Sequence, residues 1–400
     1  MNILFLSWGI LPQKTGGLEK VTYYVLKYLD KFNQNVLLII PNYDKKTMEF
    51  WEGKLKNSKI IGLNINIENI SVYNILFRKR IYNNSNISIN KDYLKAIREY
   101  KEKLLKLLEE IKPNFDIIYC YDWLTLPAAI EIKKRYNKPL VLHLHSTAYD
   151  RTGANADVLK YLEDYYIEKE GCKIADKIIV VSKRMKDILV KYYGCDENKI
   201  YVVYNAPDDN IEIRRISNWP EIKKKYKIVL YLGRITMHKG PDWLLKAAKL
   251  ILDKRKDVLF IFAGTGEMLE TLIKMAAELK ISRNVIFTGW VDDNLAEFLY
   301  DISDVFVLPS VSEPFGLTPF EALARGKAII ITKQTGVAEV LKSAAKVDFW
   351  DTQKMANYIL GLLDYEILRD YEVEKCLEEM KKLSWEQSVR RILEILSSTI

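Results

Sequence analysis

The chain has 400 residues, of which 49% are hydrophobic and 28% charged, an ordinary balance for a globular protein. Its length exceeds the size at which single cores usually stop growing, so we expect two domains of about 200 residues each. No apolar run reaches the ~18 residues that span a bilayer, and the N-terminus lacks the basic start of a signal peptide, so we predict a cytoplasmic protein. The four cysteines are far apart, with no C-x-x-C pair, and predict neither a zinc site nor a disulfide framework.

The net charge of +8 is spread unevenly along the chain. Residues 1–207 carry 33 basic and 24 acidic side chains, a net charge of +9, whereas the remainder carries −1. Such an asymmetry fits a phosphorylated substrate, an anionic membrane or nucleic acid. No nucleic-acid motif or basic stripe with interleaved aromatics accompanies it. We therefore expect a solvated lysine-rich surface and no nucleic-acid partner, with peripheral membrane contact of the basic domain as the alternative.

Short apolar, β-branched runs alternate with helix-like stretches from one end of the chain to the other. In the first half these runs are residues 3–8, 35–41, 60–65, 116–121, 139–146, 177–182 and 201–205. After a polar stretch with two prolines, near residues 206–220, they resume at 228–233, 258–264, 285–289, 304–308 and 327–332. Continuous apolar strands separated by helices predict parallel sheets covered on both faces.

The predicted fold is therefore α/β, with two doubly wound Rossmann-like domains that face a central cleft. We place the first domain at residues 1–207 and the second at residues 208–384. The last predicted helix, in residues 385–400, is expected to return to the first domain. The helix predicted for residues 91–111 has an apolar face that could touch a membrane, but packing on its own domain is the simpler interpretation.

Ligands of open parallel sheets bind at the carboxyl ends of the strands, so the segments that follow the strands are the candidates for a site. The first strand is followed by Lys14-Thr15-Gly16-Gly17-Leu18-Glu19, where two glycines let the backbone approach a ligand and a helix begins. A tight turn between strand and helix is the alternative. The segment lacks the G-x-G-x-x-G pattern and no acid closes the next strand, so a dehydrogenase is not supported.

Two cations follow the first strand of the second domain. Arg234 and Lys239 lie just before a helix that begins near Pro241, an arrangement that suits a diphosphate, although a plain surface pair would look the same. The next strand ends in a turn with Gly264 and Gly266, which suits packing against a nucleotide or simply turning the chain.

A further segment places Glu313 and Glu321 eight positions apart. Pro314 and Gly316 disfavour a helix before Thr318, so we assign Glu313 to a loop and Glu321 to the first turn of a helix. Thr318 and Glu321 match the S/T-x-x-E capping box, which gives Glu321 a purely structural alternative. Glu313 has no such alternative, and we expect its carboxylate to be free to accept hydrogen bonds from hydroxyl groups.

Together these segments resemble the retaining GT-B glycosyltransferases, especially the glycogen and starch synthases and their large sister family. The likeness rests on Glu313-x7-Glu321 within S-x-x-E-P-F-G-L-x-x-x-E-A, on Arg234 with Lys239-Gly240, and on Lys14-x-Gly16-Gly17-Leu18. It implies a nucleotide-sugar donor, UDP- or ADP-glucose first, and transfer of the hexose to a hydroxyl acceptor, an α-glucan first. It implies no cofactor and no metal, because in this family the acceptor hydroxyl is usually drawn as giving its proton to the departing phosphate.

The resemblance also implies roles for individual residues. Arg234 and Lys239 would hold the donor diphosphate, Glu313 would bind sugar hydroxyls, and Glu321 would bind the ribose. His145 matches the histidine that contacts the transferred sugar and would complete the catalytic set with Arg234, Lys239 and Glu313; a histidine hydrogen-bonded at a strand end is its alternative. The other donor-binding candidates are Lys14, Gly16, Gly17, Gly264, Gly266, Phe315, Gly316, Leu317 and Thr335, and Asp122 is expected on the acceptor side.

Three positions depart from the synthase pattern. Tyr121 stands where the synthases have histidine before Asp122, Ala206 replaces a usual glycine, and Val337 stands where a second glycine is common. These changes weaken a strict glycogen synthase assignment but spare the positions that bear the diphosphate. Within the class, the alternative is hexosyl transfer to a lipid or other small acceptor. Outside it, a sugar-nucleotide epimerase of the same architecture and a nucleotide-sugar-binding regulator stay open.

Overall fold

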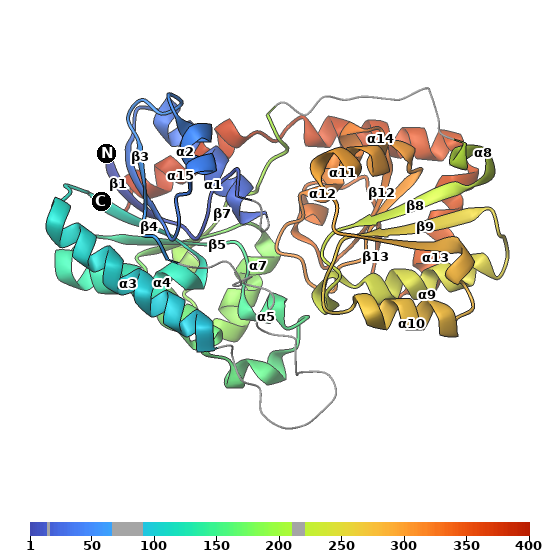
Figure 1. The fold of residues 1–400 in the computed structure, drawn as a ribbon, viewed down its shortest axis with the longest axis horizontal. Coiled ribbons are helices and arrows are strands. Elements are labelled where there is room, and N and C mark those ends of the chain that lie inside the picture. Colours follow the sequence, from blue (N-terminus) through green and yellow to red (C-terminus); the bar gives the residue numbers. More distant parts are fainter. Residues whose placement is uncertain (14–16, 66–90, 210–220) are drawn as a thin grey trace. The chain divides into compact units, whose positions relative to one another are not determined.

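The structure is a computed structural model that describes residues 1–13, 17–65, 91–209 and 221–400. The chain divides into two compact units (Figure 1). The first unit consists of Met1–Asn205 and Trp385–Ile400, and the second of Ala206–Ser384. The division falls between Asn205 and Ala206, beside the expected boundary at residues 207 and 208.

A seven-stranded parallel sheet forms the centre of the first unit, in the order β3-β2-β1-β4-β5-β6-β7. Its strands are β1 (Asn2–Leu6), β2 (Asn35–Ile40), β3 (Lys59–Gly62), β4 (Ile117–Tyr121), β5 (Leu140–Leu144), β6 (Lys177–Val180) and β7 (Ile200–Val202). Every residue of β4 and of β5 is buried, as expected of parallel strands covered on both faces. All seven apolar runs predicted in this half of the sequence therefore form strands.

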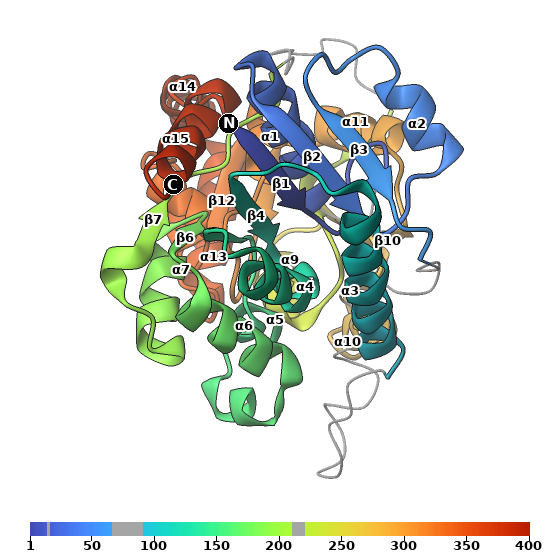
Figure 2. The ribbon, with the colours of Figure 1, turned by 90° about the vertical axis from the view of Figure 1, so that its left-hand side faces the viewer.

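Helices cover both faces of this sheet (Figure 2). They are α1 (Leu18–Lys31), α2 (Lys45–Trp51), α3 (Lys91–Ile111), α4 (Asp122–Tyr136), α5 (Ala148–Arg151), α6 (Glu163–Ile174), α7 (Lys183–Ile188) and α15 (Trp385–Ser397). Helix α3 packs against α4 and buries Ile97, Leu104 and Leu108, so its apolar face is used within its own unit. No helix in the described ranges combines the length and the apolar character needed to cross a bilayer.

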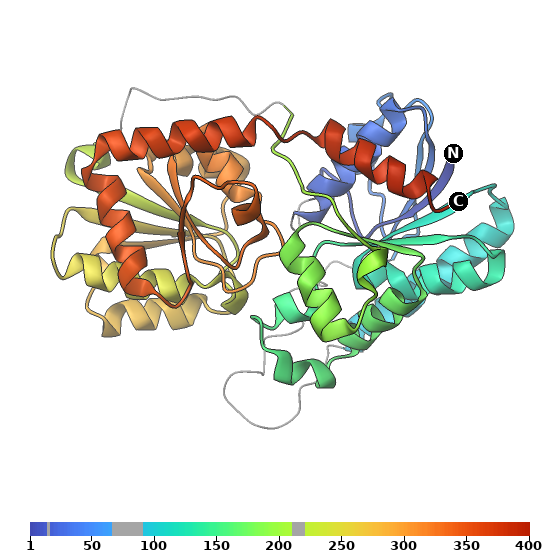
Figure 3. The same cartoon turned by 180° about the vertical axis from the view of Figure 1, so that it is seen from behind.

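The C-terminal helix α15 belongs to the first unit, as Figure 3 shows from behind. The indole of Trp385 stacks on Tyr24 of α1, with ring centroids 4.9 Å apart and planes 6° from parallel. Lys31 forms an ion pair of 2.9 Å with Glu386, and the Ser388 hydroxyl donates to a backbone carbonyl just after β7, 2.7 Å away. The expected return of the last helix is confirmed.

The second unit contains a six-stranded parallel sheet in the order β10-β9-β8-β11-β12-β13. Its strands are β8 (Lys227–Leu232), β9 (Val258–Ala263), β10 (Val285–Gly289), β11 (Val305–Leu308), β12 (Ala328–Thr332) and β13 (Ala345–Val347). Its helices are α8 (Ile222–Lys225), α9 (Pro241–Leu252), α10 (Leu269–Glu278), α11 (Asp293–Ile302), α12 (Thr318–Ala324), α13 (Thr352–Asp364) and α14 (Glu366–Met380). The edge strand β13 was not predicted, because three residues around a lysine give no apolar run.

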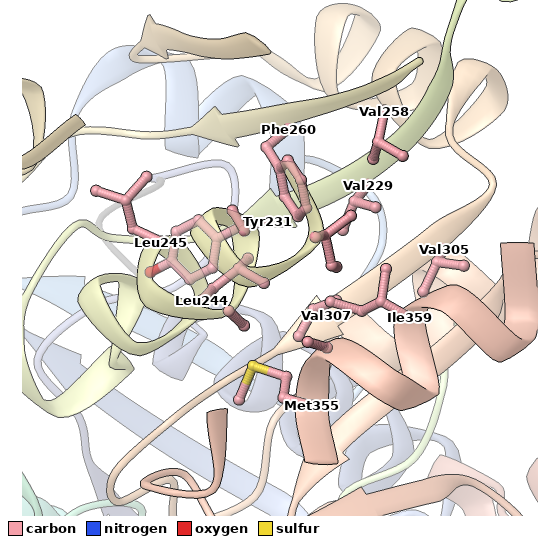
Figure 4. Close-up of a cluster of buried hydrophobic side chains, with 14 of the residues drawn as sticks. Val229, Tyr231, Leu244, Leu245, Val258, Phe260, Val305, Val307, Met355 and Ile359 are labelled. Carbon is pink, nitrogen blue, oxygen red and sulfur yellow. The ribbon is translucent and has the colours of Figure 1, made fainter. Parts of the chain in front are cut away.

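The core of the second unit lies between its sheet and helices α9, α10 and α13 (Figure 4). Val229, Phe260 and Val307 from three neighbouring strands meet Leu244 of α9 and Met355 of α13, and each of these side chains is fully buried. Burial of one such side chain contributes about 1.5–3 kcal/mol, so this layer holds the strands and the helices together. Because the strands are parallel, their carboxyl ends lie along one edge of the sheet.

Both sheets reverse their strand order once, between β1 and β4 in the first unit and between β8 and β11 in the second. The carboxyl ends of strands at such a reversal are where doubly wound sheets bind ligands. Arg234 and Lys239 follow β8, and Glu313 follows β11. In the first unit, Asp122 follows β4 directly and His145 follows β5. The two predicted doubly wound domains are confirmed, and these five residues follow a strand at a reversal or the strand next to it.

Candidate active site

The loop that follows β8 carries both predicted diphosphate ligands. The Tyr231 hydroxyl donates to the carbonyl of Arg234 at 2.5 Å, and the N–H of Ile235 donates to the carbonyl of Thr265 at 2.8 Å. A short 3₁₀ turn, Met237–Lys239, then leads into α9, which has proline in its first turn as predicted. The loop thus places Lys239 directly before the N-terminus of a twelve-residue helix, where the helix dipole favours an anion.

Gly240 allows this loop to approach the end of β11. Its φ is +63°, and a Cβ atom there would lie 2.2 Å from the carbonyl oxygen of Pro309. No other residue fits such a contact without moving backbone. The carbonyl of His238 also accepts the N–H groups of Val311 and Ser312, at 2.9 and 3.2 Å. The loops after β8 and β11 are therefore joined along their backbones.

Glu313 lies in the predicted loop, and its backbone is fixed on both sides. Its N–H donates to the carbonyl of Gln334 at 3.1 Å, and its own carbonyl accepts from Gly336 at 3.0 Å. The carboxylate forms an ion pair with the ammonium of Lys239 and accepts from the Ser310 hydroxyl at 3.4 Å. The expectation of a free carboxylate is wrong for one oxygen, Oε2, which carries both contacts because the loop contacts at Gly240 bring Lys239 to it.

Glu321 lies in the first turn of α12, as predicted, but the capping box is not formed. Leu317 is the N-cap of the helix, and no side chain caps it. The Glu321 carboxylate instead accepts a hydrogen bond from the Tyr300 hydroxyl on α11, at 2.9 Å. Tyr300 is fully buried and comes from a helix distant in the sequence, so its phenol outcompetes the local cap. The Tyr300 hydroxyl thus holds one oxygen of the Glu321 carboxylate.

Several other candidates for donor binding make contacts within the second unit. A Cβ atom at Gly264 or Gly266 would lie 2.0 Å from the Gly233 carbonyl or 2.2 Å from the Ile235 carbonyl, so both glycines support the loop of Arg234. The Thr335 hydroxyl donates to the carbonyl of Thr332 at 2.7 Å. The remaining candidates of this group are Phe315, buried against Phe320, Gly316, with φ +98°, and the N-cap Leu317.

Sequence reasoning gave no role to two side chains at the same edge. The Glu267 carboxylate accepts from the N–H of Met237 at 3.4 Å, and burial raises its pKa, partly offset by hydrogen bonds and by the charge of Arg234. Trp290 directly follows Gly289, whose carbonyl accepts the N–H of Gly264 at 2.9 Å. Trp290 itself is 72% exposed. For Trp290, the signal available in the sequence was a tryptophan directly after a predicted strand.

In the first unit, Asp122 and His145 come together at the ends of β4 and β5. Asp122 accepts the N–H of His145 at 2.7 Å, and its second oxygen lies 3.8 Å from Nδ1 of the same residue. Asp122 has φ +51°, a left-handed conformation that non-glycine residues adopt at a cost of about 1–3 kcal/mol and that clusters at functional sites. The Asp122 carboxylate therefore orients His145 through the backbone.

A cluster of tilted aromatic rings surrounds His145. Its imidazole lies 4.2 Å from that of His143 and 4.4 Å from the Tyr121 ring, between centroids. Nδ1 of His143 is hydrogen-bonded to the Tyr119 hydroxyl at 2.7 Å. Burial, with a smaller contribution from His145, holds the pKa of His143 well below its usual range, so this imidazole is neutral. Tyr121, which departs from the synthase pattern, contributes its ring to this cluster.

The remaining candidates of the first unit lie before α1. Gly17 is the exposed N-cap of that fourteen-residue helix. Lys14 and Gly16 lie outside the described residues. Within the described ranges, no group of three or more His, Cys, Asp or Glu side chains is placed to hold a metal ion.

Comparison with known families places this architecture in a class. Residues 15–210 match Glycosyltransferase Family 4, and residues 212–376 match Glycosyl transferases group 1. The two matches together take in most of the chain. The chain belongs to the glycosyltransferases that these two family models describe, and its two doubly wound sheets are those of the GT-B fold.

Individual relatives extend over nearly the whole chain. A glycosyltransferase of Methanocaldococcus jannaschii is 26% identical over 418 residues, which cover 99% of this chain and 97% of that protein. A glycogen synthase of Mycoplasma mobile is 26% identical over 437 residues, covering 90% of this chain and 89% of the synthase. Among solved structures, Anabaena HepE in complex with UDP-glucose is similar with a TM-score of 0.71 at 18% identity, and the likeness covers 100% of both chains.

Proposed function

We propose that this glycosyltransferase moves a hexose, glucose first, from UDP- or ADP-glucose to a hydroxyl group of an α-glucan, with retention of the anomeric configuration. One observation carries the proposal: Arg234 and Lys239 stand before the N-terminus of α9 at the strand reversal, with Glu313 in contact with Lys239. Two cations and a helix N-terminus suit a diphosphate, and a carboxylate beside them suits sugar hydroxyls. The glycogen synthase of Mycoplasma mobile and the UDP-glucose bound to Anabaena HepE support this choice of donor and acceptor.

In the proposed reaction, the acceptor oxygen forms a bond to the anomeric carbon while the bond from that carbon to the phosphate oxygen breaks. The proton of the acceptor hydroxyl passes to the departing phosphate, so no separate base, cofactor or metal is required. Arg234, Lys239 and the α9 N-terminus stabilise the negative charge that develops on the diphosphate. Glu313 and His145 bind the sugar, Glu321 the ribose, and Asp122 serves the acceptor side by holding His145.

Because Lys239 is paired with Glu313, the first step of donor binding is displacement of the carboxylate by the diphosphate. Both side chains are mostly buried, 19% and 10% exposed, so neither charge is well solvated. An arriving diphosphate competes with Glu313 for the ammonium, and the carboxylate is then released to accept hydrogen bonds from the sugar. Binding of the diphosphate and recognition of the sugar are thereby coupled through one lysine.

The charge distribution favours a second acceptor class. Residues 1–207 carry a net charge of +9, and an anionic small molecule or an anionic lipid would be attracted to such a surface. Hexosyl transfer to such an acceptor uses the same donor chemistry, so only the acceptor distinguishes the two proposals.

A donor screen followed by an acceptor screen tests the proposal. Calorimetry with UDP-, ADP- and GDP-sugars should identify one tightly bound donor, and that donor is then incubated with glycogen, with inositol phosphate or with anionic liposomes. Glucan-dependent release of the nucleoside diphosphate supports the first proposal, and release only with a small or lipid acceptor supports the second. Isomerisation of the donor alone would establish an epimerase, and donor binding without transfer to any acceptor would leave a regulator.

A further inference from the structure

Arg151 is buried at the end of α5, six residues after His145. Its side chain is 2% exposed, yet every edge of its guanidinium has a partner. It donates to Asp164 at 2.8 Å, to Glu168 at 2.5 Å and to the Ser146 hydroxyl at 3.0 Å. The fork of a guanidinium can hold three partners in one fixed arrangement, which a lysine cannot do.

Glu168 extends this cluster to the backbone of the same segment. Its side chain is fully buried, and its second oxygen accepts the N–H of Ala148 at 2.9 Å and the Tyr193 hydroxyl at 2.7 Å. Burial raises the pKa of Glu168 to about 7, and the charge of Arg151 is the largest effect that opposes this rise. Arg151 thus favours the ionised carboxylate that anchors Ala148.

The contacts of Arg151 bracket the pair formed by Asp122 and His145. Ser146, which accepts from Arg151, directly follows His145, and Trp123, whose ring centroid lies 5.6 Å from the guanidinium carbon, directly follows Asp122. Apolar residues of equal size often stabilise a fold as well as a buried ion cluster or better, and in some proteins such a cluster serves to specify one arrangement. Arg151 contacts the residues that follow His145 and Asp122, and this placement explains a buried arginine better than a gain in stability does.

We propose that Arg151 is a positioning residue for His145. It holds Ser146 directly and Ala148 through Glu168, and it lies against Trp123, so the imidazole keeps its place over His143 and beside Asp122. Loss of the guanidinium fork moves His145 without removing any group that touches the substrate. The statement about position stands on its own, and its consequence for transfer rests on the proposed function.

Nuclear magnetic resonance of histidine-labelled protein tests the position without any assay of activity. The chain has three histidines, and the third, His238, lies in the second unit and serves as an internal reference. In Arg151→Lys, we expect the imidazole signals of His145 and His143 to shift or broaden while that of His238 stays in place. Assignments come from His145→Gln and His238→Gln. An unchanged His145 signal in folded Arg151→Lys would overturn the proposal.

Two further variants guard against a trivial result. Arg135→Lys changes an arginine of the same unit that is 45% exposed and pairs with Glu131 and Glu109, and it should leave all three signals unchanged. If Arg151→Lys does not fold, Glu168→Gln replaces it, because the amide weakens the hold on Arg151 and Ala148 at equal size. A shift of His145 in Glu168→Gln supports the proposal, and an unchanged signal again overturns it.

A double-mutant cycle with His145 tests the kinetic consequence. Arg151→Lys should lower kcat for transfer by about 10- to 100-fold, the effect of a small misplacement, with KM for the donor nearly unchanged. In the His145→Ala background the same substitution should cost almost nothing, because its effect passes through His145. An equal loss in both backgrounds would show a general structural role. Absence of transfer by the wild type would refute the proposed function instead, and the magnetic resonance result would still stand.

Discussion

The strand-end loops of the two units differ in how they are built. In the second unit the site is made of ionised side chains, and its central pair, Lys239 and Glu313, is already matched in charge. In the first unit it is made of neutral rings, Tyr119, His143 and Tyr121 around His145, with Asp122 as the acid in direct contact. The second unit is therefore suited to exchange one anion for another. The first is suited to present fixed hydrogen-bonding groups to an uncharged sugar.

The largest expected effect tests the charged side of this comparison. Lys239→Ala and Arg234→Ala should each lower the rate of transfer by about 10²–10³-fold, as loss of an oxyanion donor does. Stopped-time assays of nucleoside diphosphate release measure it. Lys246→Ala, on the same helix α9 but bound to Asp242, is the matched control and should be near normal. Near-normal turnover in either site variant would refute the diphosphate assignment.

Glu313→Gln separates the two tasks of the ion pair. Transfer should fall by roughly 10- to 100-fold, because hydrogen bonds from sugar hydroxyls to a charged group are lost. The affinity for the bare nucleoside diphosphate should rise by about 2- to 5-fold, because Lys239 no longer has an internal partner to leave. Calorimetry with the nucleoside diphosphate and with the full donor measures both. A weaker affinity for the nucleoside diphosphate would contradict the proposed competition.

Trp290 tests whether the second unit also holds the base of the donor. Its exposed side chain follows the end of β10 and offers a face for stacking, which contributes about 1–3 kcal/mol per base. Trp290→Ala should therefore weaken nucleoside diphosphate binding about tenfold, and Trp290→Phe should restore much of it. Trp350→Ala, which alters another exposed tryptophan of the same unit, is the control. Equal affinity in the wild type and Trp290→Ala would remove the indole from the site.

Glu372 gives the second unit a pH dependence outside its site, with no expected effect on transfer. Burial raises the pKa of Glu372 from its usual 4.5 to about 8. Between these two pH values the folded protein keeps a proton on Glu372 that the unfolded chain releases. The stability that this group contributes to the folded state is therefore complete below pH 4.5 and is lost as the pH rises towards 8. Glu372→Gln, which keeps an acceptor for the N–H groups of Ile329 and Ala345, should raise the melting temperature at pH 9 but not at pH 4. Equal melting temperatures at pH 9 would contradict the buried ionisation.

The strands and the strand ends were the part of the molecule that the sequence could predict. Buried parallel strands need continuous apolar residues, and the run that became β4 shows this plainly. Residues just after such strands must lie at one edge of the sheet, so Arg234, Lys239 and Glu313 could be grouped without coordinates. The strand β13 escaped prediction because it is short and sits at an edge, where pairing with β12 replaces an apolar pattern.

Pairing between side chains could not be predicted, because it depends on approach between distant segments. Tyr300 reaches Glu321 from another helix and removes the capping box that local sequence favoured. Lys239 meets Glu313 only because Gly240 lies against Pro309. The contacts of Arg151 with α6 and with Trp123 leave no periodic pattern in the sequence.

The return of α15 to the first unit has a consequence for the order in which the protein forms. During synthesis the whole of the second unit leaves the ribosome before Trp385 does, so the first unit waits for its last helix while its neighbour can already fold. Until then the ring of Tyr24 lacks the stacked indole that covers it in the finished protein. A nascent chain stalled before residue 385 should therefore expose α1 to chaperones, although most of the sequence of the first unit has been made.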